Sequence, residues 1–155
     1  MLVKADILNT GYEVLFTGLS GAFLAQVLKF FIHLIFKKKV DFKLFTTTGG
    51  MPSSHSSGVV GIATAVGIIS GFSSIDFSIA MGYALVVMYD AAGLRRASGK
   101  MAVCLNRIMD DFYKHEVQAV GGKLKELLGH TPVEVFAGAI LGVVYAYYIH
   151  FIVLQ

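Results

Sequence analysis

Four apolar runs constrain this chain more than any other feature of its sequence. They cover about residues 12–36, 59–72, 75–92 and 133–154. A helix over the first run would reach roughly 37 Å, and the hydrocarbon core of a bilayer is about 30 Å thick. With 55% hydrophobic and 15% charged residues, a soluble domain of 155 residues has too little interior to bury these runs. The sequence therefore predicts an all-α, polytopic membrane helix bundle built from a single membrane domain, residues 1–155.

The arrangement of the runs gives further expectations about packing. The link Ser73-Ser74 between the two middle runs is tight, so these runs either cross the membrane fully or form a re-entrant hairpin. The glycine pairs Gly67/Gly71 and Gly138/Gly142 have the spacing that is typical of closely packed membrane helices. Between the last two runs, apolar residues recur at helical spacing with charges between them, which predicts an amphipathic helix.

The distribution of positive charge predicts how the bundle lies in the membrane. All lysines and arginines except Lys4 and Lys29 fall in the connection after the first run or in the connection before the last. Basic connections stay in the cytoplasm, so both termini should face away from it. We therefore expect an integral protein of a bacterial plasma membrane with its functional face in the cytoplasm. Lys29 lies within the first run, close enough to the Lys37 end for its ammonium group to snorkel there.

Composition also limits the partners. The formal net charge of +3 is too small to indicate nucleic-acid binding. The single cysteine, Cys104, excludes an intramolecular disulfide, and no Cys/His cluster has the spacing of zinc ligands. We expect no metal and no other cofactor. Membrane lipid is the expected partner, and self-association into a homo-oligomer stays open.

The first candidate cluster follows the first basic connection. Gly49 and Gly50 free the backbone to approach a ligand closely, and the hydroxyl groups of Ser53 and Ser54 suit phosphate oxygens at a helix N-terminus. His55 beside them can exchange a proton near neutral pH. The alternative interpretation is a helix start capped by serine, with an incidental histidine.

The second and third candidate clusters flank the other basic connection. Thr131 and Glu134 fit a capping box, and Glu134 can also orient His130, two roles that are compatible. Asp90 ends the third apolar run, where a carboxylate is costly unless it is paired. The adjacent arginines, Arg95 and Arg96, are its obvious partners; they suit phosphate and also fit as interface anchors. All three clusters are expected at the same membrane face.

Three long motifs carry a family resemblance. They are Gly-Gly-Met-Pro-Ser-Ser-His at residues 49–55, Met-Tyr-Asp-Ala-Ala-Gly-Leu-Arg-Arg at residues 88–96, and Leu-Lys-Glu-Leu-Leu-Gly-His-Thr-Pro at residues 124–132. In this order they resemble the divergent branch of the type-2 phosphatidic acid phosphatase family, which is related to acid phosphatases and vanadium-dependent haloperoxidases. The resemblance covers about residues 49–142 and implies a membrane-bound phosphatase.

The resemblance also implies roles for individual residues. In the mainstream superfamily one histidine attacks phosphorus, an aspartate orients it, and a second histidine protonates the leaving alcohol. The matching positions here are His130, Glu134 and His55. The superfamily's Ser-Arg pair and its Lys-x6-Arg-Pro motif are absent from this chain. The groups expected to hold the phosphate instead are Arg95, Arg96, Lys100, Ser53 and Ser54, with Asp90 in support.

The sequence thus predicts metal-independent hydrolysis of a lipid phosphate monoester or diphosphate through a phosphohistidine intermediate. A cytoplasmic site favours a lipid of the inner leaflet, so phosphatidylglycerophosphate is the first expected substrate and a polyprenyl phosphate or diphosphate is the second. The alternative is a non-catalytic membrane module that retains the fold and binds a phospholipid headgroup, which the missing arginine motif favours.

Overall fold

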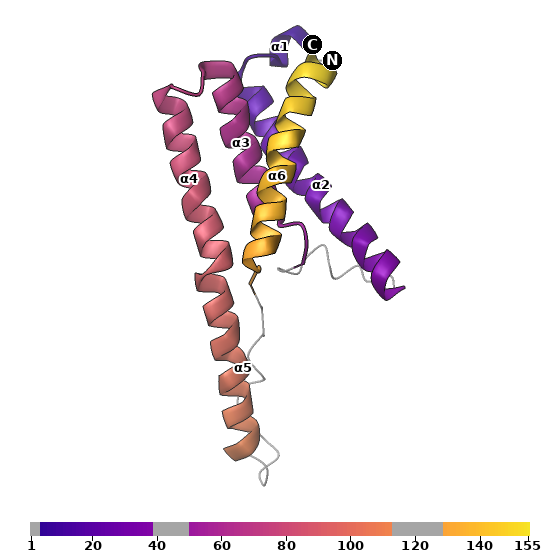
Figure 1. The fold of residues 1–155 in the computed structure, drawn as a ribbon, viewed down its shortest axis with the longest axis vertical. Helices are drawn as coiled ribbons and strands as arrows, with labels where there is room; N and C mark the ends of the chain where they lie inside the picture. The colour runs from indigo at the N-terminus through magenta and orange to yellow at the C-terminus, as the bar shows by residue number, and fades with distance from the viewer. Residues whose placement is uncertain (1–3, 39–49, 113–128) are drawn as a thin grey trace.

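The computed structural model describes residues 4–38, 50–112 and 129–155, and all regular elements within them are helical (Figure 1). In chain order the elements are α1 (Lys4–Ile7), α2 (Gly11–Lys37), α3 (Ser54–Ser70), α4 (Ile75–Ala92), α5 (Leu94–Phe112), α6 (Pro132–Tyr148) and the π-helical turn η2 (Ile149–Leu154). The prediction of an all-α membrane bundle is confirmed, and α5 is its amphipathic helix.

Three helical stretches of the described chain are long and apolar enough to cross a membrane. They are Gly11–Lys37, Ile75–Asp110 and Pro132–Leu154. Helix α3 is shorter and reaches about 25 Å at the usual rise per residue. Large apolar side chains on the outside of the bundle, such as Leu19, Ile79 and Phe136, are exposed, as expected for helices that lipid surrounds.

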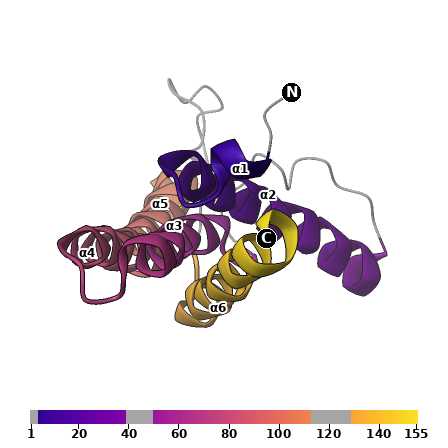
Figure 2. The same cartoon turned by 90° about the horizontal axis from the view of Figure 1, so that it is seen from above.

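Helix α3 is the centre of the bundle, because it contacts α2, α4 and α6 (Figure 2). The residues of α3 that face α6 are small, and the residues of α6 that contact them are glycines. A Cβ atom added at Gly138 would collide with the carbonyl oxygen of Ser53, and one added at Gly142 would press on the carbonyl oxygen of Ser57. The predicted role of this glycine pair in close helix packing is therefore confirmed.

The other glycine pair serves different purposes. Gly67 packs against the rings of Phe72 and Phe77, which leave no room for a Cβ atom there. Gly71 ends α3 with a φ of 93°, and a Cβ atom added to it would have nothing within 4 Å. Gly71 is thus needed for its backbone conformation, and the prediction of a helix-packing pair is wrong for it.

The two ends of the bundle differ in what they contain. Helix α1, the C-terminus and the link between α3 and α4 lie at one end, whereas the end of α2 and the starts of α3 and α6 lie toward the other (Figure 1). Helix α5 continues the line of α4 beyond the bundle at that second end (Figure 1). Both basic connections therefore join elements at the end opposite the termini.

The terminal end is held together by a buried acid–histidine pair. The Nδ1 atom of His150 lies 2.6 Å from Oε1 of Glu13, whose side chain is completely buried. The other carboxylate oxygen of Glu13 accepts the N–H of Asn9 at 2.7 Å. A carboxylate in an apolar setting is stable only when its oxygens have such partners. The pair thus joins the start of α2 to η2.

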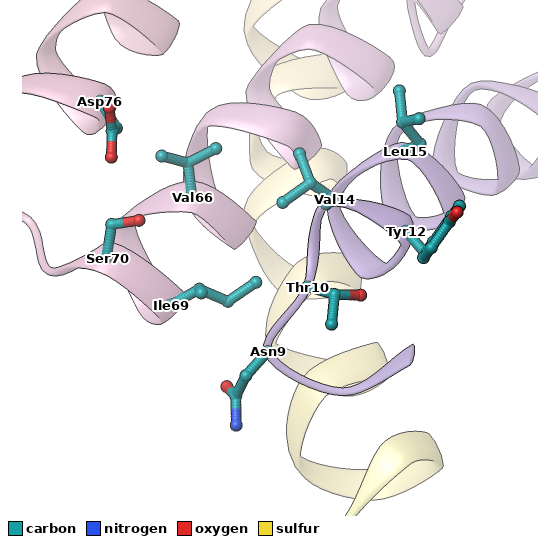
Figure 3. Close-up of a pocket in the computed structure, with 10 residues that line it drawn as sticks. Asn9, Thr10, Tyr12, Val14, Leu15, Val66, Ile69, Ser70 and Asp76 are labelled. Carbon is teal, nitrogen blue, oxygen red and sulfur yellow. The ribbon is translucent and has the colours of Figure 1, made fainter. Parts of the chain in front are cut away.

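A cavity of about 730 Å³ opens at this terminal end, between the start of α2 and the end of α3 (Figure 3). Its polar lining comes from Asn9, Thr10, Ser70 and Asp76, and the rest is mainly apolar. None of the residues predicted for the functional site lines it. Those residues lie toward the opposite end of the bundle, where α3 and α6 begin.

Candidate functional site

The start of α6 is built by a capping box. Thr131 Oγ1 accepts the N–H of Glu134 at 3.3 Å, and Glu134 Oε2 accepts the N–H of Thr131 at 3.1 Å. Pro132 occupies the first helical position, where its missing N–H costs nothing. This local structure follows directly from the sequence and fixes the carboxylate of Glu134 against the turn that precedes the helix.

His130 lies in that preceding turn and is held from two sides. Its backbone N–H donates to the carbonyl oxygen of Ala91 at 3.2 Å, which attaches the turn to the end of α4. Its Nδ1 atom lies 3.0 Å from Glu134 Oε2. Because a carboxylate can only accept, Nδ1 is the donor, and the neutral ring is left with its lone pair on Nε2. The His130 side chain is only 3% exposed.

The start of α3 lies beside the start of α6. The N–H of Ser53 donates to the carbonyl oxygen of Glu134 at 3.0 Å, which joins the two helix starts directly. Ser53 Oγ accepts the N–H of Ser56 at 3.4 Å and so caps α3. Ser54 Oγ donates to Gln26 Oε1 of α2 at 2.7 Å. Both serine hydroxyls thus have partners within the protein, and the serine-capped helix start is present as an element of the site.

The two histidines predicted to cooperate lie close together. The rings of His55 and His130 are 6.3 Å apart between centroids, at an angle of 66°. His55 comes from the first turn of α3 and is exposed, whereas His130 is buried next to Glu134. The fold therefore brings together two histidines that are distant in the sequence. His130 is buried and held by a carboxylate, and His55 is accessible.

The third cluster is only partly described. Asp90 lies in the last turn of α4, adjacent to the Ala91 carbonyl that binds His130. Arg95 and Arg96 lie in the first turn of α5, and their side chains fall outside the described part of the structure. Lys100 is exposed on α5, which continues from α4, and no contact between Lys100 and either histidine is found among the described residues. Their roles in phosphate binding stay predictions.

Lys29 is a site residue that the sequence interpretation missed. It does not snorkel to the membrane surface, because its side chain is only 4% exposed. Its methylene groups pack against Gly50, where a Cβ atom would lie 3.2 Å from Lys29 Cδ, and its ammonium group interacts electrostatically with Glu134. A lysine within an apolar run was the available signal, but the run did not reveal which way the side chain turns.

Comparison with known proteins assigns the family. Residues 10–145 match the model of the divergent PAP2 family. The chain belongs to this family. Within it, the Bacillus subtilis (strain 168) protein YuiD, described as an uncharacterized membrane protein, is 39% identical over 139 residues, which cover 83% of this chain and 88% of YuiD. No solved structure matches the chain. Divergent PAP2 membership confirms the predicted resemblance and marks the chain as a phosphatase-related integral membrane protein.

Proposed function

We propose that the protein is a lipid phosphate phosphatase in which His130 is the nucleophile. The observation that carries this proposal is the hydrogen bond between His130 Nδ1 and Glu134, together with the ring of His55 at 6.3 Å. The hydrogen bond presents Nε2 of His130 as a nucleophile with a fixed orientation. The exposed imidazole of His55 is placed to exchange protons with a group bound between the two rings.

In the first step Nε2 of His130 attacks phosphorus, and the bond between phosphorus and the lipid oxygen breaks. Protonated His55 gives its proton to that oxygen, so the lipid leaves as an alcohol. The phosphoryl group stays on His130 as phosphohistidine. Glu134 keeps the Nδ1 proton and balances the positive charge that develops on the ring.

In the second step water attacks the phosphohistidine. Neutral His55 removes a proton from the water molecule, the bond between nitrogen and phosphorus breaks, and inorganic phosphate is released. His130 returns to its neutral form and His55 is again protonated. His55 therefore acts as a general acid in the first step and as a general base in the second.

Cations and amides must stabilise the phosphoryl oxygens during both steps. The N-terminal amides of α3 lie next to the two histidines and suit an anion. We assign the remaining charge to Arg95 and Arg96, as expected from the sequence. Because these groups supply the positive charge that a metal ion would otherwise supply, the proposed reaction is metal-independent.

The proposed substrate is a lipid that carries a phosphate monoester or diphosphate, with phosphatidylglycerophosphate first and a polyprenyl diphosphate second. The concentration of basic residues in the two connections favours a site on the cytoplasmic face, where an inner-leaflet lipid is available. The competing candidate is a non-catalytic module that binds a phospholipid headgroup. Its specific support is the capping box, which gives Glu134 a structural role without any chemistry.

Release of inorganic phosphate separates the two candidates. The purified protein is placed in nanodiscs that contain phosphatidylglycerophosphate, phosphatidic acid or a polyprenyl diphosphate. We expect wild-type protein to release phosphate from at least one lipid and the His130→Ala protein to release none. If lipids bind to wild-type protein while no phosphate is released from any of them, the enzymatic proposal is wrong and the binding module stands.

A further inference from the structure

The half of α2 that leads to Lys37 carries three basic or titratable side chains on one face. Lys29, His33 and Lys37 follow one another at intervals of four residues, so they line one side of the helix. Together with Gly50 and Met51 they border a cavity of about 200 Å³. The cavity therefore combines a cationic wall with a loop segment that lies directly before the cap of α3.

Lys29 connects this cavity with the histidine pair. It lines the cavity, and its charge is attracted electrostatically by that of Glu134, the residue that holds His130. Gly50 has a φ of 85° and packs on the lysine stem. Taking a lysine out of water is costly unless an anion compensates its charge. A ligand phosphate in the cavity would supply that compensation.

A second, apolar cavity of about 320 Å³ adjoins the first. The two share Ile32 and Met51 as lining residues. The apolar cavity continues between α2 and α6, and its further lining includes Leu28, Ala137, Ile140 and Val144. Ile140 and Val144 are exposed on the lipid-facing surface of α6. A groove of this kind suits a hydrocarbon chain that enters from the surrounding membrane.

We propose that the two cavities together hold one glycerophospholipid, with its phosphodiester against Lys29, His33 and Lys37 and one acyl chain in the apolar groove. This inference rests on the proposed function and narrows its substrate. The reacting phosphate is then a terminal monoester that extends from the headgroup toward His130. Lysine binds phosphate as a point charge. The adjoining apolar groove suits the acyl chain of the same lipid.

The substrate class is thus a glycerophospholipid that has a terminal phosphate monoester in addition to its phosphodiester. Phosphatidic acid has a single phosphate, so it can fill only one of the two proposed phosphate positions. A polyprenyl diphosphate lacks the glycerol spacer between its two phosphorus atoms. The protein should therefore prefer phosphatidylglycerophosphate over both of these lipids.

The preference is tested by neutralising the cationic wall. In nanodiscs, the ratio of kcat/KM for phosphatidylglycerophosphate to that for phosphatidic acid is measured for wild-type protein and for the double variant His33→Gln/Lys37→Gln. We expect the ratio to fall roughly tenfold or more, the effect of losing a charge-assisted hydrogen bond. The matched control is Lys38→Gln, which removes a charge at the same helix end from a residue that does not line the cavity. It should leave the ratio unchanged.

The groove is tested separately by filling it. Val144→Trp should raise KM for a substrate with long acyl chains more than for one with short chains. Val143→Trp places the same bulk on a neighbouring residue of α6 that does not line the groove, and it should show no such chain-length effect. Circular dichroism confirms that each variant is folded. Equal chain-length dependence in both variants would overturn the assignment of the groove.

A binding measurement keeps the test independent of catalysis. Native mass spectrometry reports whether the protein retains phosphatidylglycerol, which has the phosphodiester and no monoester, in preference to phosphatidylcholine. Retention that is lost in His33→Gln/Lys37→Gln, without hydrolysis of any lipid by wild-type protein, would refute the proposed phosphatase and leave the lipid site standing. Hydrolysis with equal preference in wild-type and variant proteins, and equal retention of phosphatidylglycerol, would refute the lipid site and leave the phosphatase standing.

Discussion

The Nδ1 atom of His130 lies 3.0 Å from Oε2 of Glu134, the same oxygen that accepts the N–H of Thr131 at 3.1 Å. One carboxylate oxygen therefore serves the cap of α6 and the orientation of the proposed nucleophile. The cap involves Thr131 and the orientation involves His130, so substitutions can separate the two functions.

Thr131→Ala and Glu134→Gln should have different effects. Thr131→Ala removes the cap acceptor for the Glu134 N–H and should lower the free energy of unfolding by about 1 kcal/mol, with phosphatase turnover largely retained. Glu134→Gln keeps an oxygen that can accept at the cap, so stability should change little. It loses the negative charge beside His130, so turnover should fall clearly. Thermal unfolding in detergent and phosphate release measure the two effects; equal losses of turnover in both variants would contradict the division.

The histidines should differ in their dependence on the leaving group. His130→Ala removes the nucleophile and should abolish turnover with every substrate. His55→Ala removes the proposed acid and should lower turnover of a lipid substrate about 10²–10⁴-fold. A nitrophenyl phosphate needs little protonation of its leaving oxygen, so His55→Ala should affect its release much less. Steady-state rates with both substrates give the comparison, and an equal loss with both would argue against His55 as the general acid.

Vanadate should inhibit the enzyme, and EDTA should not. The start of α3 offers backbone amides near His130, and Arg95 and Arg96 are assigned the positive charge that a five-coordinate phosphoryl group requires. Vanadate mimics that geometry and should bind with His130 as an axial ligand. Phosphate release with and without each reagent is the measurement, and His130→Ala should no longer bind vanadate. A strict requirement for added Mg²⁺ with no vanadate effect would contradict the histidine mechanism.

Gly138 should tolerate no side chain. A Cβ atom there would collide with the Ser53 carbonyl oxygen and approach Ser56 Cβ to 3.0 Å, so Gly138→Ala should lower the free energy of unfolding by about 1–3 kcal/mol. Gly82→Ala in α4 is the matched control, since nothing lies within 4 Å of its new Cβ atom. That variant should be neutral or more stable by up to about 1 kcal/mol. Thermal unfolding distinguishes the two, and similar destabilisation of both would argue against the close contact of α3 and α6.

Both termini should face away from the cytoplasm. Helix α1 and the C-terminus lie at the same end of the bundle, and the basic connections join elements at the other end (Figure 1). A reporter that is active only outside the cytoplasm should therefore be active when fused at Gln155, and a fluorescent reporter fused there should be dark. The opposite pattern would place the histidines on the outer face.

The all-helical fold and the start of α6 could be predicted because their signals are local. Apolar runs determine helices in lipid, and Thr131, Pro132 and Glu134 determine a capping box wherever they occur together. The position of Lys29 depends instead on a contact between residues that are far apart in the sequence. Its side chain packs against Gly50, a residue distant in the sequence. The spacing of apolar residues along one helix cannot predict such a contact. The same holds for Gly71, whose spacing from Gly67 resembled a packing motif although its role is a turn.

The shared oxygen of Glu134 has a consequence for the evolution of related chains. A lineage that lost phosphoryl transfer would still need a side-chain oxygen at position 134 to cap α6, so selection for folding alone would retain Glu134 or replace it with glutamine. His55 takes part in neither helix cap, so selection for the two caps would not retain it. Among descendants of a common ancestor, loss of His55 with Glu134 intact would therefore mark the chains that kept the membrane fold and gave up catalysis.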